Sequence, residues 1–259
     1  MPTFLPPYHH VADPLIEEAD EGMTAASVHK LFSALRTELI PIVDSITEQS
    51  EEDHRRLGCF GESAQLAFCL SVIRRIGYDF ERGRLDKTVH PFCTRLSAGD
   101  IRITTRVFEN DLTQALFSSL HEAGHALYEQ GVDPALEGTP LGRGTSVGVH
   151  ESQSRLWENV EQDVHWFSGI MGGGFQSYTI GNILSAQFYA AAMKAHPNIP
   201  KEIAAGEFEP LHSWLRENLY RHGRKFKPSE LVRRVTGEQM NSGPYLSYLR
   251  AKYADRIRA

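Results

Sequence analysis

The stretch Phe117-Ser-Ser-Leu-His-Glu-Ala-Gly-His-Ala-Leu-Tyr-Glu-Gln-Gly131 contains the pattern His-Glu-x-x-His at residues 121 to 125. An α-helix turns by about 100° per residue, so His121 and His125 project from one face about one turn apart. Two imidazoles at that separation can hold one Zn²⁺ ion at roughly 2.0–2.1 Å each. Glu122 lies one residue round from the first histidine, where it can reach a water on the metal without binding the metal itself. The stretch therefore predicts a metal-binding helix with a general base beside the metal.

The surrounding residues support a helix here. Asn110 or Asp111 can cap its start, and Gly131 can end it. Apolar residues recur at spacings of three and four, namely Leu112, Leu116, Leu120, Ala123 and Leu127. The alternative interpretation is two surface histidines on an ordinary amphipathic helix, because a chain with 12 histidines shows the pattern by chance about a few per cent of the time.

A third candidate ligand favours the metal site over that alternative. Glu151 follows His125 by 26 residues (151 − 125). It belongs to a second helical stretch, Val149 to Asn159, which is opened by the Gly- and Thr/Ser-rich loop from Gly142 to Gly148. A glutamate that completes two histidines and leaves one position open is a catalytic zinc arrangement.

The bulk composition excludes several classes of partner. With 259 residues and 41% hydrophobic content, the chain can bury a large core, and we expect residues 1–259 to form a single domain. The net charge of −6 gives no reason to expect nucleic acid or an anionic membrane as partner. The chain start shows neither a basic nor an apolar signal region, and no apolar run approaches the length of a membrane span. Three cysteines, an odd number without metal-ligand spacing, indicate reduced thiols in a cytoplasmic protein.

The remaining pattern is helical with one β element. Residues 1–23 read as a loop. Asp86 to Ser97 and Ile101 to Val107 read as a β-hairpin, which could bind an extended peptide beside the metal helix or only cover the core. Helices are expected at residues 24–46, 63–76, 112–131, 149–159, 178–195, 199–206, 211–222, 229–236 and 243–257. The predicted fold class is therefore mainly α, with one small hairpin or sheet.

Five motifs, taken in order, resemble the carboxypeptidase Taq family of zinc carboxypeptidases, and weaker similarity extends from Tyr8 to Ile46 and along the C-terminal third. The resemblance implies a helical, zincin-like peptidase fold with the small sheet beside the His-Glu-x-x-His helix. It implies His121, His125 and Glu151 as metal ligands and Glu122 as general base. The five motifs are His90-Pro-Phe92, Asp100-Ile-Arg102-Ile-Thr104, His121-Glu-Ala-Gly-His125, His150-Glu-Ser-Gln153 and Gln162-Asp-Val-His165-Trp166.

The same resemblance implies that His165 lines the cleft. His165 or Tyr178 would have to stabilise the oxyanion, and both are therefore candidate catalytic residues. The residues lining the substrate cleft would be His90, Asp100, Arg102, Thr104, Gln153 and Arg221.

The chain departs from the family pattern in three places. It lacks the N-terminal helical region, and it also lacks a block between Asn159 and Gln162. That block normally carries an Ile/Val-Arg-x-x-Ala-Asp motif, whose arginine is expected to hold the substrate's terminal carboxylate. Gly174 stands where the family has a tyrosine near the oxyanion. Arg102, Arg155 or Arg221 would have to replace the missing arginine.

We therefore expect a metallocarboxypeptidase with one Zn²⁺ per chain, Co²⁺ or another divalent ion being the alternative, that acts on peptides as a homodimer. The metal would polarise the scissile carbonyl, and Glu122 would take the proton of the attacking water and pass it to the leaving amine. The alternatives are an aminopeptidase or oligopeptidase of relaxed specificity, and a catalytically weak metal-binding remnant with a scaffold role.

Overall fold

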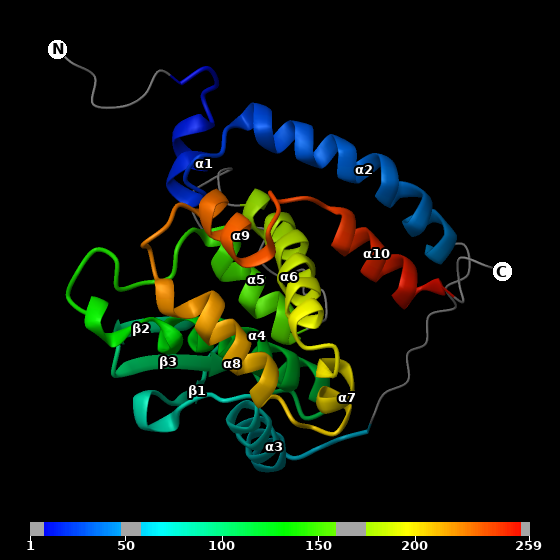
Figure 1. Cartoon of the computed structure of the whole chain (residues 1–259). Coiled ribbons are helices and arrows are strands. Elements are labelled where there is room, and N and C mark those ends of the chain that lie inside the picture. The colour runs from blue at the N-terminus through cyan, green and yellow to red at the C-terminus, as the bar shows by residue number, and fades with distance from the viewer. Residues whose placement is uncertain (1–7, 48–57, 159–174, 255–259) are drawn as a thin grey trace.

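Helix α4 (Leu112–Gly131), which carries the His-Glu-x-x-His pattern, packs against a small sheet and against helix α5 (Val147–Glu158). The computed structural model describes residues 8–47, 58–158 and 175–254. Asp111 caps α4, since its side chain accepts a hydrogen bond from Thr113 N at 3.0 Å. The helix ends at Gly131. Its start and end therefore lie where the sequence predicts them, and the arrangement is mainly helical (Figure 1).

The sheet has three strands in the order β1-β3-β2. Strands β2 (Cys93–Ser97) and β3 (Asp100–Thr105) form the predicted antiparallel hairpin. The structure adds a third strand to the predicted hairpin, because Asp86 lies in a separate strand, β1 (Leu85–Lys87), which runs parallel to β3. Pro91, in the loop between β1 and β2, has no N–H for a ladder, and this is one reason why the two stretches do not form one strand.

The alternating side chains of β3 pack the sheet against α4. Ile101 and Ile103 are fully buried, and Arg102 between them is exposed. Thr105 Oγ1 hydrogen-bonds Ser118 Oγ at 2.8 Å and accepts from Ser119 Oγ at 3.0 Å, both on α4. Because side chains alternate between the two faces of a strand, Ile101, Ile103 and Thr105 face α4 while Arg102 faces away from it.

The other helices agree with the predicted stretches apart from their ends. The predicted helix 211–222 was too long, since Leu219 has non-helical backbone angles and a short 3-10 turn, η3 (Tyr220–His222), follows. The last helix ends at Lys252. The elements are α2 (Ala25–Thr47), α3 (Glu62–Arg75), η1 (Phe80–Arg82), η2 (Pro134–Leu136), α6 (Phe175–Ala195), α7 (Ile199–Ala204), α8 (Glu209–Asn218), α9 (Pro228–Thr236) and α10 (Gly243–Lys252).

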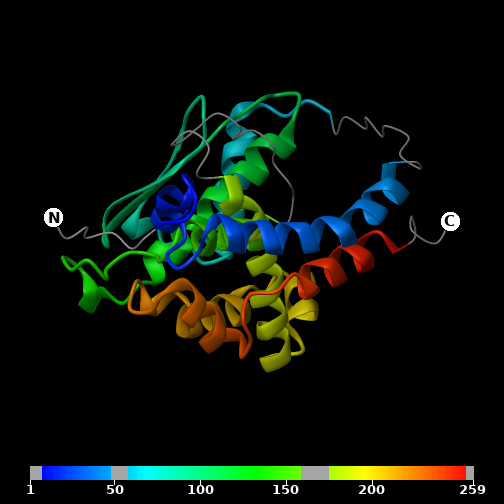
Figure 2. The same ribbon diagram turned by 90° about the horizontal axis from the view of Figure 1, so that it is seen from above.

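Two apolar clusters hold these elements together. The larger one surrounds α4 and includes Tyr128, Phe188 and Tyr220, all with no exposed surface. In the smaller one, Leu35 and Ile42 of α2 meet Tyr245 of α10. Helices α2 and α10 lie side by side in both Figures 1 and 2. Helix α6 belongs to both clusters and so links the α2–α10 pair to the layer that contains α4 and α5.

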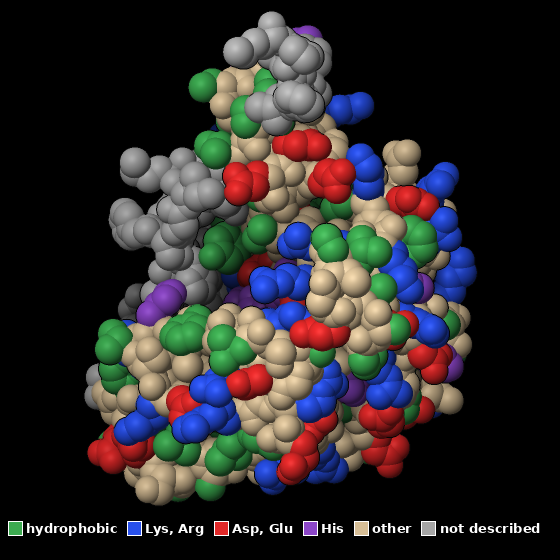
Figure 3. Space-filling model, turned by 90° about the vertical axis from the view of Figure 1, so that its left-hand side faces the viewer, with side chains coloured by type: hydrophobic (Ala, Val, Ile, Leu, Met, Phe, Trp, Pro, Cys, Tyr) green, Lys and Arg blue, Asp and Glu red, His purple; other side chains and the backbone are tan. Residues whose placement is uncertain are grey.

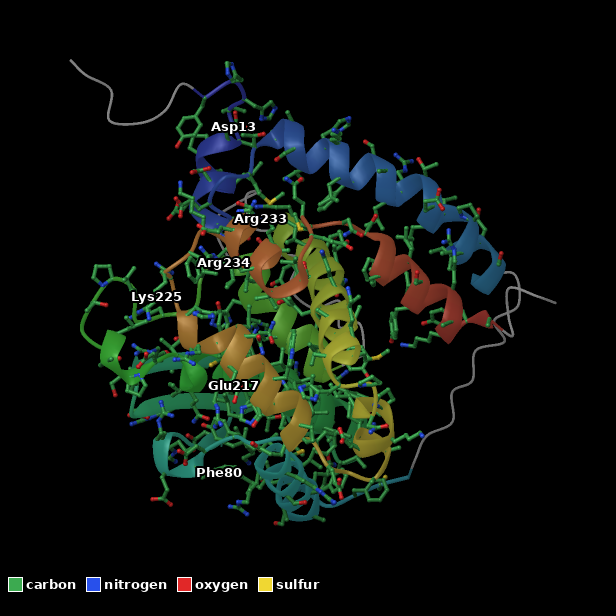
Figure 4. All side chains as sticks on the ribbon, viewed as in Figure 1. Asp13, Phe80, Glu217, Lys225, Arg233 and Arg234 are labelled. Atoms are coloured by element: carbon green, nitrogen blue, oxygen red, sulfur yellow. The ribbon has the colours of Figure 1, made fainter. Side chains whose placement is uncertain are left out.

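The prediction that residues 1–23 form a loop was wrong, because α1 (Asp13–Ala19) lies within them. The Asp13 carboxylate, labelled in Figure 4, accepts hydrogen bonds from the backbone N–H groups of His9, His10 and Ala25. Asp20 is 2% exposed. Asp20 Oδ1 accepts from Gly148 N at 2.8 Å, and Asp20 Oδ2 accepts from Ser177 Oγ at 2.7 Å. Asp20 thus caps α5 from 128 residues away, a long-range contact that local pattern does not reveal.

We expect Asp20→Ala to lower the free energy of unfolding by about 2–3 kcal/mol, because it removes charged hydrogen bonds and leaves buried donors without their acceptor. Urea unfolding of the metal-free protein measures this. The control is Glu21→Ala, because Glu21 forms an exposed ion pair with Lys227 and its loss should leave the midpoint nearly unchanged. Equal midpoints for both variants would show that Asp20 does not hold α1 and α5 together.

Candidate metal centre

The structure brings the three predicted metal ligands together. Donor atoms of His121, His125 and Glu151 all lie within 4.8 Å of one another. His121 Nε2 is 3.9 Å from Glu151 Oε1, and His125 Nε2 is 3.5 Å from Glu151 Oε2. Two donors that each lie about 2.1 Å from a tetrahedral ion are about 3.4 Å apart. The separations and the donor chemistry therefore fit a divalent metal ion.

Two glycines allow this convergence. A Cβ added at Gly124 would lie 2.5 Å from the carbonyl oxygen of Gln153 and 2.7 Å from Ser154 Cα, so α4 and α5 approach closely between the two histidines. A Cβ at Gly181 of α6 would lie 2.6 Å from Glu151 Cγ. Helices α4, α5 and α6 thus meet around the three donors because no side chain separates them at these positions.

Hydrogen bonds to the far nitrogen of each histidine direct the other nitrogen towards Glu151. His121 Nδ1 lies 2.7 Å from Glu158 Oε2, and His125 Nδ1 lies 3.1 Å from the carbonyl oxygen of His150. Each acceptor places the proton on Nδ1, and the Nε2 lone pair remains for a metal. Burial lowers the pKa of both His121 and His125 to about 4, so both rings are neutral at pH 7, as metal ligands must be.

Glu151 is held in its ionised form. Burial alone would raise its pKa, but the neighbouring histidines and Arg155 outweigh burial and bring the pKa to about 2. Arg155 Nε lies 2.8 Å from Glu151 Oε1. The Tyr178 ring centre is 5.7 Å from Arg155 Cζ. Arg155 therefore supports the Glu151 carboxylate and also lies beside the Tyr178 ring.

Glu122 is a buried carboxyl group that lies near two other buried carboxylates. It is 4% exposed. Burial raises its pKa to about 8, and the negative charges of Glu151 and Glu158 add to the shift. A divalent cation beside these carboxylates would oppose that shift. Strand β2, which contains Cys93, packs against α4, the helix that carries Glu122. Burial raises the pKa of the Cys93 thiol, and the charge of Glu122 raises it further.

The residues of β3 that were predicted to bind substrate make contacts other than with the three metal-donor side chains. Asp100 and Arg102 bind one another through two hydrogen bonds of 2.8 and 2.7 Å, on the part of β3 where Arg102 faces away from α4. Phe92 N donates to Thr104 Oγ1 at 2.8 Å, so Thr104 fixes the loop that contains His90. His90 is exposed. The structure thus gives Thr104 a structural contact and does not bring Arg102 to the metal ligands.

The other predicted site residues lie in different surroundings. Gln153 is fully buried, and its Nε2 donates to Ser152 Oγ at 2.8 Å. Arg221 is exposed and belongs to η3, which packs on the C-terminal end of α4, where Tyr220 contacts Gly131. His165 lies outside the described residues, as does Gly174.

Sequence reasoning missed the residues that support the ligands. Glu158 has no exposed side-chain surface and follows Glu151 by seven residues, which is two helical turns. Glu129 follows His125 by four residues and is also buried. Helical spacing placed both carboxylates on the same faces as the ligands, but the pattern could not show which neighbour each one binds.

Two histidines one turn apart on one helix, together with a glutamate from the next helix, form a site of the metallopeptidase type. The family model of the carboxypeptidase Taq (M32) metallopeptidases matches residues 5–161 and 160–253. The chain belongs to this family and is therefore an enzyme of the metallocarboxypeptidase class. The two matched stretches meet at residues 160–161, close to where the sequence pattern lacks an internal block.

Named relatives agree with this assignment. Thermostable carboxypeptidase 1 of Thermus thermophilus is 31% identical over 96% of this chain and 68% of its own length. Carboxypeptidase 1 of Bacillus subtilis is 28% identical over 95% and 69%. The crystal structure of the M32 carboxypeptidase from Deinococcus radiodurans R1 matches with a TM-score of 0.89 and 41% identity, over 96% of this chain and 70% of that chain. The chain thus spans about two thirds of the length of these relatives.

In the part of the chain that the structure describes, none of the helices is both long and apolar enough to span a bilayer. Cys59, Cys69 and Cys93 are free thiols. The cytoplasmic location stays a prediction.

Proposed function

We propose that His121, His125 and Glu151 hold one divalent ion, Zn²⁺ by preference, and that Glu122 serves as general base in the hydrolysis of peptides. The observation that carries this proposal is the convergence of the three donors within 4.8 Å, with a buried carboxyl group next to the first histidine in the chain. Two imidazole nitrogens and one carboxylate oxygen with an open position are the donor set of catalytic zinc sites. Co²⁺ has similar ligand preferences and is the alternative.

The chemistry follows from the positions of the protein's own groups. When bound, the metal supplies Lewis-acid polarisation of the scissile carbonyl and acidifies water. Glu122 accepts the proton of the attacking water and delivers it to the leaving amine. Glu158 and the carbonyl of His150 keep the two histidine rings in one orientation, and Arg155 does the same for Glu151.

Tyr178 is the proposed oxyanion donor among the described residues. It lies at the start of α6, beside the Arg155 guanidinium that binds Glu151. A hydroxyl that donates to the developing oxyanion contributes about 2.7–4 kcal/mol. His165 is the second proposed donor, on the family resemblance.

The peptide is proposed to align along β2. This strand is an edge of the sheet in the described part of the chain, and it packs against α4, the helix that carries the proposed general base. An edge strand offers unpaired N–H and C=O groups to an extended peptide. A substrate paired with β2 would thus run past Glu122.

Few of the candidate arginines are available to bind the C-terminal carboxylate of a peptide substrate. Arg102 already binds Asp100, and Arg155 already binds Glu151. Of the three candidates, Arg221 alone has no ion pair within the described residues, and we propose it as the cation for the carboxylate. The second candidate function, a peptidase that does not require a free C-terminus, follows if Arg221 does not reach the substrate.

We expect Glu151→Gln to weaken metal binding strongly, since it removes the only charged ligand, and Glu122→Gln to keep the metal but lose at least about 10²-fold in peptidase rate. Elemental analysis and peptide hydrolysis on the same samples measure both. Glu137→Gln, which changes an exposed carboxylate on the Arg95 side, is the control. Near-normal turnover by Glu122→Gln, or full metal affinity in Glu151→Gln, would refute the respective assignment.

The terminal carboxylate can be tested with one peptide in free and C-amidated forms. If Arg221 binds the carboxylate, amidation should lower kcat/KM by about 10-fold or more, because a charged hydrogen bond contributes roughly 1.5–3 kcal/mol. Arg221→Met should then remove the preference. Equal cleavage of both forms would favour the peptidase of relaxed specificity.

We also propose that the protein forms a homodimer, as the family resemblance implies. Large exposed apolar side chains support it, among them Val89, Phe92 and Leu96, which are 80%, 48% and 60% exposed. Figure 3 shows apolar side chains interspersed among charged ones on one face of the molecule. Light scattering should give twice the chain mass of 29.1 kDa, and a monomer mass at every concentration would exclude the dimer.

A further inference from the structure

A chain of polar contacts extends behind His125, away from Glu151. His125 Nδ1 lies 3.1 Å from the carbonyl oxygen of His150 and 2.6 Å from the ring nitrogen Nδ1 of His150. His150 Nε2 lies 3.0 Å from Glu129 Oε1. Because Glu129 is one turn after His125 on α4, the contacts close a loop between α4 and α5. The proposed mechanism uses the backbone carbonyl of His150 but assigns no role to the His150 ring or to Glu129.

The backbone carbonyl oxygen of His150 sets the direction of these hydrogen bonds, because it cannot donate. A carbonyl oxygen only accepts, so the proton of His125 must be on Nδ1. Two N–H groups cannot face one another at 2.6 Å, so His150 Nδ1 must be without a proton and accepts from His125. The proton of His150 is then on Nε2, where it is donated to the Glu129 carboxylate.

Glu129 is anchored as an ionised acceptor. It is 7% exposed. Gly144 N donates to its Oε1 at 3.1 Å, and Arg95 Nε lies 3.2 Å from its Oε2. Burial raises its pKa, but His150, Gly144 and Arg95 outweigh burial and lower it. Arg95 also pairs with Glu137 near the surface. The Glu129 carboxylate is therefore held by Arg95 of β2, His150 of α5 and Gly144 in the loop before α5.

We propose that Glu129 and the His150 ring act as positioning residues that, together with the backbone carbonyl of His150, keep the proton of His125 on Nδ1 and so keep its Nε2 lone pair towards the metal position. The inference rests on the proposed metal centre. His121 obtains the same orientation directly from the Glu158 carboxylate. For His125 the carboxylate acts through a second imidazole, and the bare Nδ1 of that imidazole depends on Glu129. Groups that orient metal-binding histidines in this way typically change metal affinity 10- to 100-fold.

The most direct test reads the tautomers in the metal-free protein, without any substitution. Long-range ¹H–¹⁵N NMR spectra of the histidine rings at neutral pH distinguish Nδ1–H from Nε2–H. We expect Nδ1–H for His125 and Nε2–H for His150. A proton on His150 Nδ1, or on His125 Nε2, would overturn the proposal. Because no variant is needed, a folding defect cannot obscure this result.

A second test measures Zn²⁺ affinity by competition with a chromophoric chelator. His150→Leu removes the ring acceptor and should weaken Zn²⁺ binding about 10-fold or more. His150→Asn places an amide oxygen close to the position of Nδ1 and should bind nearly as tightly as the wild type. The control Glu137→Gln removes a charge from the same network without touching His150 and should change little. Equal affinities for all three variants would contradict the relay.

A double-substitution cycle separates the relay from a plain charge effect. Glu129→Leu should weaken Zn²⁺ binding in the wild-type background and much less in the His150→Asn background, where no imidazole transmits the effect. A charge effect alone would be equal in both backgrounds and would refute the relay. If the wild type itself bound no Zn²⁺, the proposed function would fail instead, so the two failures are distinguishable.

Discussion

The close approach of helices α4 and α5 at Gly124 is the contact on which the site depends. The two histidines lie on either side of this glycine, and the backbone of α5 occupies the space that a Cβ would fill. Only at this separation does Glu151 reach both imidazoles. The sheet and η3 pack on other faces of α4 and hold it in place. A displacement of α5 by one side-chain width would leave the two histidines without their third partner.

Electrostatics gives this buried arrangement a second property. Glu122, Glu151 and Glu158 are each at most 5% exposed, and Arg155 is the cation that the structure places against two of them. Buried carboxylates in such numbers repel one another, and their burial costs free energy unless opposite charge is near. A divalent ion at the donor set would provide that charge. Metal binding and folding stability are therefore expected to be linked.

The sequence predicted those features that depend on local spacing. The His-Glu-x-x-His spacing and Glu151 named the three side chains that the structure brings within 4.8 Å. The Asp111 cap, the end of α4 at Gly131 and the β2–β3 hairpin depend on neighbouring residues and were predicted as well.

Features that depend on contacts distant in sequence were missed. Helix α1 is seven residues long, and its anchor, Asp20, binds Gly148 and Ser177. Strand β1 pairs in parallel with β3. Nothing in the local pattern marks Glu158 among the acidic residues, and folding alone brings it to the His121 imidazole. No spacing rule along one helix identifies a partner on another, so these contacts required the structure.

The proposed function requires that His121, His125 and Glu151 together hold one metal ion. X-ray diffraction from crystals grown with Zn²⁺, collected on both sides of the zinc absorption edge, can locate that ion. We expect one strong anomalous peak per chain, bounded by the Nε2 atoms of both histidines and the carboxylate of Glu151. A peak elsewhere, or none at these three residues in a zinc-saturated crystal, would contradict it.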